Sequence, residues 1–95
     1  MDGQGEGATS WRMISIVAAE AELRKQIGIN VRRRRMTQGL TLEEASKRAA
    51  MPCRKWQKIE CGGVVNLTLT TLARIATVLK MTMPELMYEP SRDVS

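Results

Sequence analysis

The chain of 95 residues contains no histidine and only two cysteines, Cys53 and Cys61. Without histidine, the usual zinc-ligand patterns and every catalytic arrangement that uses an imidazole base are excluded. The cysteine spacing matches no redox motif, so we interpret both as ordinary thiols, which stay reduced in the cytosol. The glycines at the start of the chain precede no strand, so they form no phosphate-binding loop. We therefore expect no enzymatic activity, no metal site and no cofactor.

Long apolar runs are also missing. No stretch of 18 or more apolar residues occurs, which argues against a membrane span. The opening residues, MDGQGEGATS, lack the basic and then apolar layout of a secretory signal. We expect a cytoplasmic protein that does not contact a membrane.

Positive charge is abundant and unevenly distributed. The whole chain carries a net charge of +5, yet from Arg24 to Lys58 eleven Lys or Arg residues face only Glu43 and Glu44, a local net charge of +9. The remaining four basic residues face eight acidic ones, a net charge of −4. Such a block indicates a surface that binds a polyanion, although it is also compatible with a merely solvated helix face.

The first third of the chain predicts a flexible tail at 1–9 followed by a helix. Strong helix formers fill the stretch from about Trp11 to Gln26, and Ser10 is a candidate N-cap. We expect Gly28 to interrupt this helix and Gly39 to end the basic segment that follows. Within that segment, Arg32–Arg35 sweep about 300° around a helix, so one arginine must face inward and find a partner.

The middle of the chain predicts two short helices joined by a tight turn. Thr41 and Glu44 have the spacing of a capping box, which begins a helix over 42–50. Met51-Pro52 breaks it, and a second helix over 53–60 follows. The second helix places Trp56 and Ile59 on its inner side and leaves its basic residues largely outward.

The last third predicts two more helices. Apolar residues at spacings of three and four give an amphipathic helix over about 69–81 with Thr68 as its N-cap, and Thr82 begins a short one over 83–87. Residues 89–95 are expected to form a C-terminal tail. Five or six helices without a convincing strand predict an all-α protein.

A capped helix, a tight turn and a short basic helix are the pattern of a helix-turn-helix. The chain resembles the phage-repressor-like (Xre-type) helix-turn-helix family in four segments, VRRRRMTQGLT, EEASKRA, KWQKIECG and LTTLARIATVLKMTMPEL, which together cover about 27–87. The resemblance implies a compact five-helix, lambda-repressor-like domain at 28–88, with 10–27 as an additional N-terminal helix. The reading helix would be about 53–60.

The same resemblance implies roles for individual residues. Arg35 matches the arginine that often pairs with the glutamate ending the reading helix, here Glu60. The expected DNA contacts are Cys53, Arg54, Lys55, Gln57 and Lys58 on the reading helix, together with Arg33 and Thr41. Arg54 has the chemistry to read guanine and Gln57 to read adenine, whereas Lys55 and the arginines at 32–34 suit phosphates.

Three positions depart from the family pattern. The glycine of the turn is replaced by Ala50, where a positive φ would be strained. Leu42 stands where a glutamine often contacts the phosphate side. Trp56 is large for its position, and the small residues Ala45, Ala49 and Ala50 indicate a compensating exchange of volume in the core.

Ahead of the region of resemblance lie Trp11, Met13, Ile14, Ile16 and Val17, which cover too much of a helix for one small domain to bury. They could pack back on the domain, form a dimer contact or hold a partner protein.

We interpret the chain as a sequence-specific transcriptional regulator that binds double-stranded DNA at a palindromic operator as a homodimer. Two alternatives share the DNA-binding mechanism. One is an antitoxin whose additional helix holds a toxin, and the other is a restriction-modification controller, which the stretch NLTLTTL from Asn66 weakly favours.

Overall fold

The computed structural model describes residues 2–88, and their side chains from Met13 onward. This part of the chain forms five α-helices and no strand, which confirms the all-α prediction. The helices are α1 (Asp2–Thr37), α2 (Leu42–Arg48), α3 (Cys53–Glu60), α4 (Leu69–Leu79) and α5 (Met83–Met87). The C-terminal tail expected at 89–95 lies outside the described residues.

The first helix is continuous through Gly28, so the predicted interruption is wrong, and the helix begins at Asp2 rather than after a tail at 1–9. Gly28 is buried where the end of α3 approaches α1. A Cβ atom there would lie 2.7 Å from the carbonyl oxygen of Ile59 and closer still to that of Glu60. The glycine therefore serves close packing between two helices, although its helix propensity is poor.

The helix-turn-helix is formed as the sequence predicts. Thr41 caps α2 in a capping box with Glu44, whose carboxylate accepts the Thr41 backbone N–H at 2.9 Å. The helix ends at Arg48 with Ala49 as its C-cap, Ala50 follows with φ 55°, and the N–H of Met51 donates to the Ser46 carbonyl at 3.0 Å. This is a Schellman ending with alanine at the position that glycine usually occupies. The prediction of a positive φ at Ala50 is confirmed.

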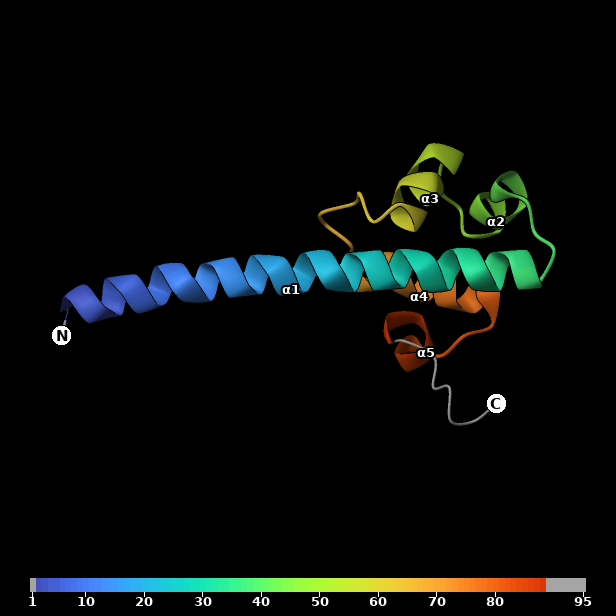
Figure 1. Ribbon diagram of the computed structural model, residues 1–95. Coiled ribbons are helices and arrows are strands. Elements are labelled where there is room, and N and C mark those ends of the chain that lie inside the picture. Colours follow the sequence, from blue (N-terminus) through green and yellow to red (C-terminus); the bar gives the residue numbers. More distant parts are fainter. Residues whose placement is uncertain (1, 89–95) are drawn as a thin grey trace, which may run out of the picture.

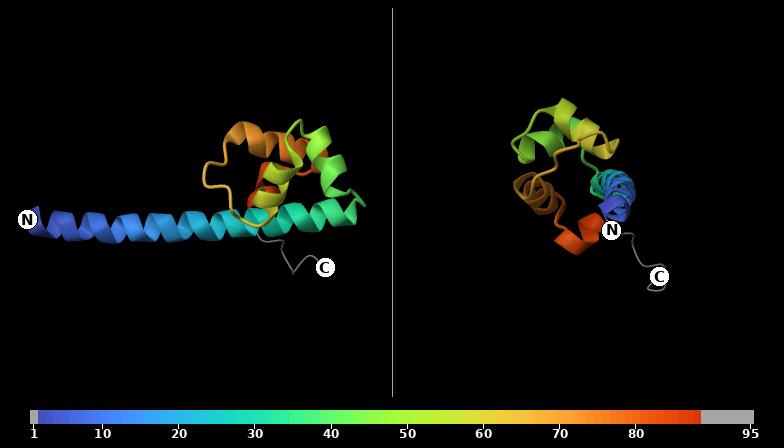
Figure 2. Two further views of the ribbon diagram at one scale, coloured as in Figure 1. Left: turned by 90° about the horizontal axis from the view of Figure 1, so that it is seen from above. Right: turned by 90° about the vertical axis from the view of Figure 1, so that its left-hand side faces the viewer.

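The helices are arranged around α1, with α2 and α3 on one side and α4 and α5 on another (Figures 1 and 2). A single hydrophobic core fills the space between them, and its largest fully buried side chains are Trp56, Ile59, Ile75, Leu79, Leu86 and Val31. Ala45 and Ala49 are buried in the same core. Ala45 on α2 and Ala49 at its C-cap thus leave room for Trp56 on α3, whereas Ala50 is exposed and does not take part in the expected exchange of volume.

Polar side chains of α1 and of Gln38, the residue after it, close the C-terminal ends of α4 and α5. Asn30 is 3% exposed, and its amide nitrogen donates to the carbonyls of Leu86 at 2.9 Å and Tyr88 at 2.8 Å. Arg34 Nε donates to the Leu79 carbonyl at 3.0 Å, and Gln38 donates to the same oxygen at 2.7 Å. These bonds satisfy carbonyls that a helix end leaves without a partner.

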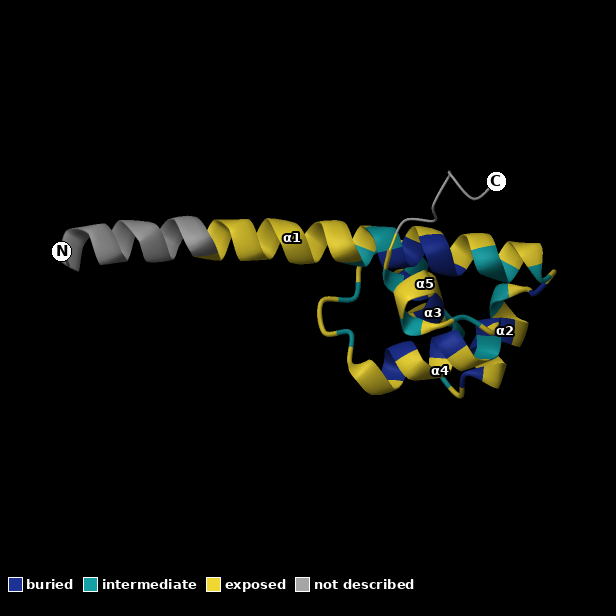
Figure 3. Cartoon of the chain, turned by 90° about the horizontal axis from the view of Figure 1, so that it is seen from below, coloured by how far each residue is buried: buried dark blue, intermediate teal, exposed yellow. Residues whose placement is uncertain are grey.

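The N-terminal part of α1 projects beyond the other helices (Figures 1 and 3). Every residue from Met13 to Leu23 is exposed, which excludes the alternative that this apolar segment packs back on the domain. The side chain of Trp11 lies outside the described residues. None of the helices in the described part of the chain is both long and apolar enough to span a membrane.

Candidate nucleic-acid interface

The inner side of α3 is fixed in the domain by three residues of the same helix. Trp56 is 0% and Ile59 1% exposed, and both belong to the core. The indole Nε1–H of Trp56 donates to Glu60 Oε2 at 2.7 Å. Because these residues lie three and four apart, they share one face and determine which side of α3 turns to solvent.

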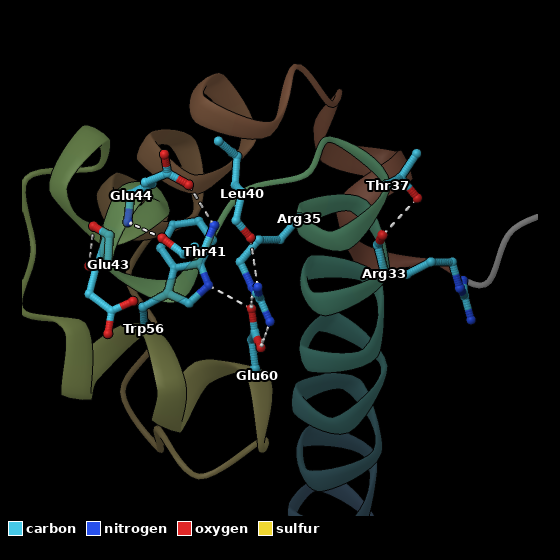
Figure 4. Close-up of polar contacts among 10 residues, drawn as sticks. Arg33, Arg35, Thr37, Leu40, Thr41, Glu43, Glu44, Trp56 and Glu60 are labelled. Carbon is cyan, nitrogen blue, oxygen red and sulfur yellow. Dashed lines mark hydrogen bonds and ion pairs between the residues drawn. The ribbon is translucent and has the colours of Figure 1, made fainter.

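Arg35 and Glu60 form the ion pair that the family resemblance implies. Arg35 Nε lies 2.6 Å and Nη2 3.2 Å from the two carboxylate oxygens, so the pair is bidentate (Figure 4). The guanidinium also donates to the Leu40 carbonyl at 2.8 Å. The hydrogen bonds to Glu60 raise the pKa of Arg35, against an opposing effect of burial. The pair connects α1, the loop before α2 and the last turn of α3.

The outer side of α3 carries Arg54, Lys55, Gln57 and Lys58, and all four side chains are exposed. Cys53, at the first position of the helix, is half-buried and is a free thiol. Residues of this side and of the following loop line a shallow hollow of about 400 Å³, with Pro52, Gly63 and Val64 at its apolar wall. All five predicted contacts of α3 therefore lie either at its N-terminal end or on its exposed side.

Thr41 lies at the start of α2 with its hydroxyl oxygen already in use. That oxygen accepts the Glu44 backbone N–H at 3.0 Å. Thr41 can therefore still donate its hydroxyl proton to a ligand. Hydrogen bonding from Thr41, chiefly from its backbone N–H, lowers the pKa of Glu44. A carboxylate at this end of α2 disfavours an approaching phosphate, so Thr41 is a weaker candidate than the residues of α3.

Arg33 is separated from the other predicted contacts. Its side chain is exposed and leaves α1 on the side opposite to Arg35 and α3 (Figure 4). Two positions along a helix correspond to about 200° of rotation, which accounts for the opposite directions of Arg33 and Arg35. The structure thus does not bring Arg33 to the surface of α3.

Two features of the site are not predicted from the sequence. Arg34, one of the arginines expected to suit phosphates, instead donates to the carbonyls of Leu79 and Lys80 at 3.0 Å each. The hydrogen bond from Trp56 to Glu60 is not among the expectations, although their i, i+4 spacing is a signal for it. Two of the four consecutive arginines are therefore structural.

Comparison with known proteins agrees with this geometry. A family model described as a helix-turn-helix domain matches residues 26–87. No curated protein matches the sequence significantly.

Two solved structures show the same fold. The restriction-modification controller protein C.AhdI from Aeromonas hydrophila has a TM-score of 0.63 and 24% identity, and the match covers 66% of this chain and 94% of that protein. The hypothetical transcription factor NHTF from Neisseria has a TM-score of 0.70 and 21% identity, and the match covers 79% of this chain and 85% of that one. At these identities the likeness is one of fold. Because the family model matches well over half of the sequence, the chain belongs to the helix-turn-helix domain family, in agreement with its Xre-type resemblance.

Proposed function

We propose that the protein is a sequence-specific transcriptional regulator that binds a palindromic operator as a homodimer and inserts α3 into the major groove. One observation carries the proposal. The inner side of α3 is locked by Trp56, Ile59 and the Glu60 ion pair, so the opposite side presents two ammonium groups, an amide and a guanidinium to solvent. A helix held this way is pre-organised for docking into a groove.

The exposed side chains divide by chemistry. A guanidinium at the start of the reading helix, Arg54, can donate two hydrogen bonds to the O6 and N7 atoms of guanine. The amide of Gln57 can pair with adenine in the same groove. Lys55 and Lys58 supply point charges that suit phosphates and carry little sequence information. The interface thus combines one or two base readers with flanking backbone contacts.

The experiment is a binding-site selection followed by salt titrations on the selected operator. Arg54→Ala should cost roughly 1–3 kcal/mol and relax the preference at one position in each half-site. Lys55→Ala should weaken binding to all sequences about equally, and it should reduce the salt slope by about one for each phosphate that it no longer neutralises.

Arg33→Ala is the matched control, because it removes an exposed arginine on the far side of α1. It should leave both the preferred site and the salt slope unchanged. If Arg54→Ala keeps the parental preference and alters only the salt slope, Arg54 is a phosphate contact and the assignment of a base reader is wrong.

Two narrower roles use the same mechanism. A restriction-modification controller would bind DNA through the same α3, and an antitoxin would add a toxin contact on the projecting part of α1. A methyltransferase or toxin gene beside this one would distinguish them.

A further inference from the structure

Two cations lie on α1 beside the line along which α1 touches α3. Gly28 marks that line, because a Cβ atom there would meet the backbone carbonyls at the end of α3. At about 100° per residue, Arg32 and Lys25 lie about 40° and 60° from Gly28 in one direction around α1. The core residues Ile27 and Val31 lie about 100° and 60° from it in the other direction. Arg32 and Lys25 therefore stand on the solvent side of the contact, and we call this pair the α1 edge.

The charge of the α1 edge is not neutralised by an ion pair. Both side chains are exposed. Within residues 13–88 the one ion pair is that of Arg35 and Glu60, so the nearest carboxylate of α3 is already in use. No acidic residue lies within four positions of Arg32 along α1, whereas Lys25 has Glu22 three positions before it. Arg32 is thus the stronger of the two cations toward an anionic ligand.

The α1 edge borders the exposed side of α3 opposite to its lysine-lined hollow. Glu60 is turned to α1 by its pair with Arg35. Around α3, Gln57 lies about 60° from Glu60 in one direction, and Lys55 lies about 140° from it in the other. Lys55 lines the hollow together with Gly63 of the following loop. The core fills the space on one side of the line where α1 and α3 touch, so the α1 edge and the exposed side of α3 share the other side.

This arrangement matches the two walls of a major groove. The groove is about 12 Å wide and a helix with its side chains is about 10–12 Å across, so a reading helix lies close to the phosphate backbone on both sides. Lys55 suits the backbone on the side of the hollow. Arg32 and Lys25, about 10.5 Å apart along α1, lie on the side of the other backbone. Cations at that place gain by neutralising phosphates, whatever the base sequence.

We propose that Arg32 and Lys25 contact the DNA backbone on the α1 side of the groove, so that cations hold both strands beside α3. The proposal rests on the proposed function and deepens it, because it adds a second contact surface to the same interface. Lys25 precedes residue 26, where the match to the helix-turn-helix family begins, so this contact extends beyond the matched domain.

The first test is the salt dependence of binding to the selected operator, measured by fluorescence anisotropy for Arg32→Ala and Arg33→Ala. The two variants remove the same charge from adjacent exposed residues, but Arg33 leaves α1 on the far side (Figure 4). Arg32→Ala should make the fall in affinity between 50 and 200 mM salt about 3.5-fold smaller for each half-site, whereas Arg33→Ala should not change it. Arg32→Lys should behave as the parent, because neutralising a phosphate requires only the charge.

The outcomes separate this proposal from the proposed function. If Lys55→Ala reduces the salt dependence and Arg32→Ala does not, α3 binds DNA without the α1 edge, and the present proposal alone is wrong. Equal salt dependence of Arg32→Ala and Arg33→Ala also overturns it, since the effect is then one of net charge. A parent that binds no DNA overturns both proposals.

The second test locates the contacts on the duplex by ethylation interference, in which an ethyl group neutralises one phosphate at a time. An ethylated phosphate weakens binding of the parent, but not of a variant that has already lost the residue in contact with it. Arg32→Ala and Lys55→Ala should each relieve interference at one phosphate in each half-site, and these two phosphates should lie on opposite strands. Lys25→Ala should relieve it on the same strand as Arg32→Ala. Relief by Arg32→Ala on the strand of Lys55, or at no phosphate, contradicts the proposed geometry.

Discussion

Gly28 combines two opposing physical effects at one residue. Alanine would favour the helix by about 1 kcal/mol, but its Cβ would overlap the backbone carbonyls of Ile59 and Glu60 at the end of α3. Backbone atoms in a packed domain cannot yield as a flexible side chain does. We expect Gly28→Ala to destabilise the domain by about 1–3 kcal/mol in urea unfolding.

Gly63→Ala is the matched control for that substitution. A Cβ at Gly63 would lie 3.6 Å from the Lys58 carbonyl oxygen, which is an ordinary contact. The urea midpoint of Gly63→Ala should therefore stay close to that of the parent. A Gly28→Ala protein as stable as the parent, or more stable, would show that the two helices do not approach as closely as described.

The Arg35–Glu60 pair is the second residue-scale feature, with side chains only 12% and 7% exposed. Glu60→Ala would leave the guanidinium and the Trp56 indole N–H without their shared acceptor. We expect a loss of about 3 kcal/mol, and a smaller loss for the double variant with Arg35→Ala than for the sum of the two single variants. Thermal melts of the single and double variants measure both quantities. A Glu60→Ala melt that coincides with the parent contradicts this role.

At the scale of the element, two capping boxes begin α2 and α5. Hydrogen bonds from Thr41 and Thr82 lower the pKa of Glu44 and of Glu85 below the ordinary value of 4.5. A folded-state pKa below the unfolded one gives stability that is full above the unfolded value and is lost as the pH falls through the folded value.

We therefore predict that the parent loses stability below about pH 4.5 more steeply than Glu44→Gln/Glu85→Gln, whose amides keep the cap geometry without titrating. Urea unfolding at a series of pH values between about 3 and 7 measures the difference. Glu43→Gln, an exposed carboxylate outside the two boxes, is the control. If the free energy of unfolding falls equally with pH in the parent and in the double variant, protonation of Glu44 and Glu85 does not contribute to the loss of stability.

Elements with local signals could be predicted from the sequence, whereas contacts between distant segments could be predicted only where the family resemblance supplied them, as for Arg35 and Glu60. The capping box at Thr41 depends on residues three apart, and the positive φ at Ala50 is expected from the glycine of the family pattern; both are in the structure. Gly28 has the sequence signal of a helix break, because glycine is a poor helix former. The reason for its presence, the close approach of α3, lies about thirty positions away in the chain and is not visible in its neighbours. The role of Arg34 escapes prediction for the same reason, since its acceptors at the end of α4 are 45 and 46 positions away.

At the scale of the whole molecule, the cations of α3 and the apolar side chains of the projecting part of α1 lie apart, although single apolar side chains such as Val65 and Leu69 are exposed on the domain as well. The exposed cations of α3 lie on the helix-turn-helix, whereas the exposed apolar segment lies on the part of α1 that projects from it (Figure 3). Charge concentrated on one surface steers association with a polyanion, which is what the proposed DNA contact on α3 requires.

The proposed binding of a homodimer to a palindromic operator predicts how the affinity depends on operator length. If two copies read half-sites one DNA turn apart, inserting five base pairs at the operator centre turns one half-site by about half a turn. The second reading helix then faces away from its groove, so the advantage of linked binding disappears, and the affinity should fall on the order of 10²-fold. Fluorescence anisotropy at a fixed salt concentration measures it. Equal affinity of the parent for both operators would mean that the half-sites are read independently.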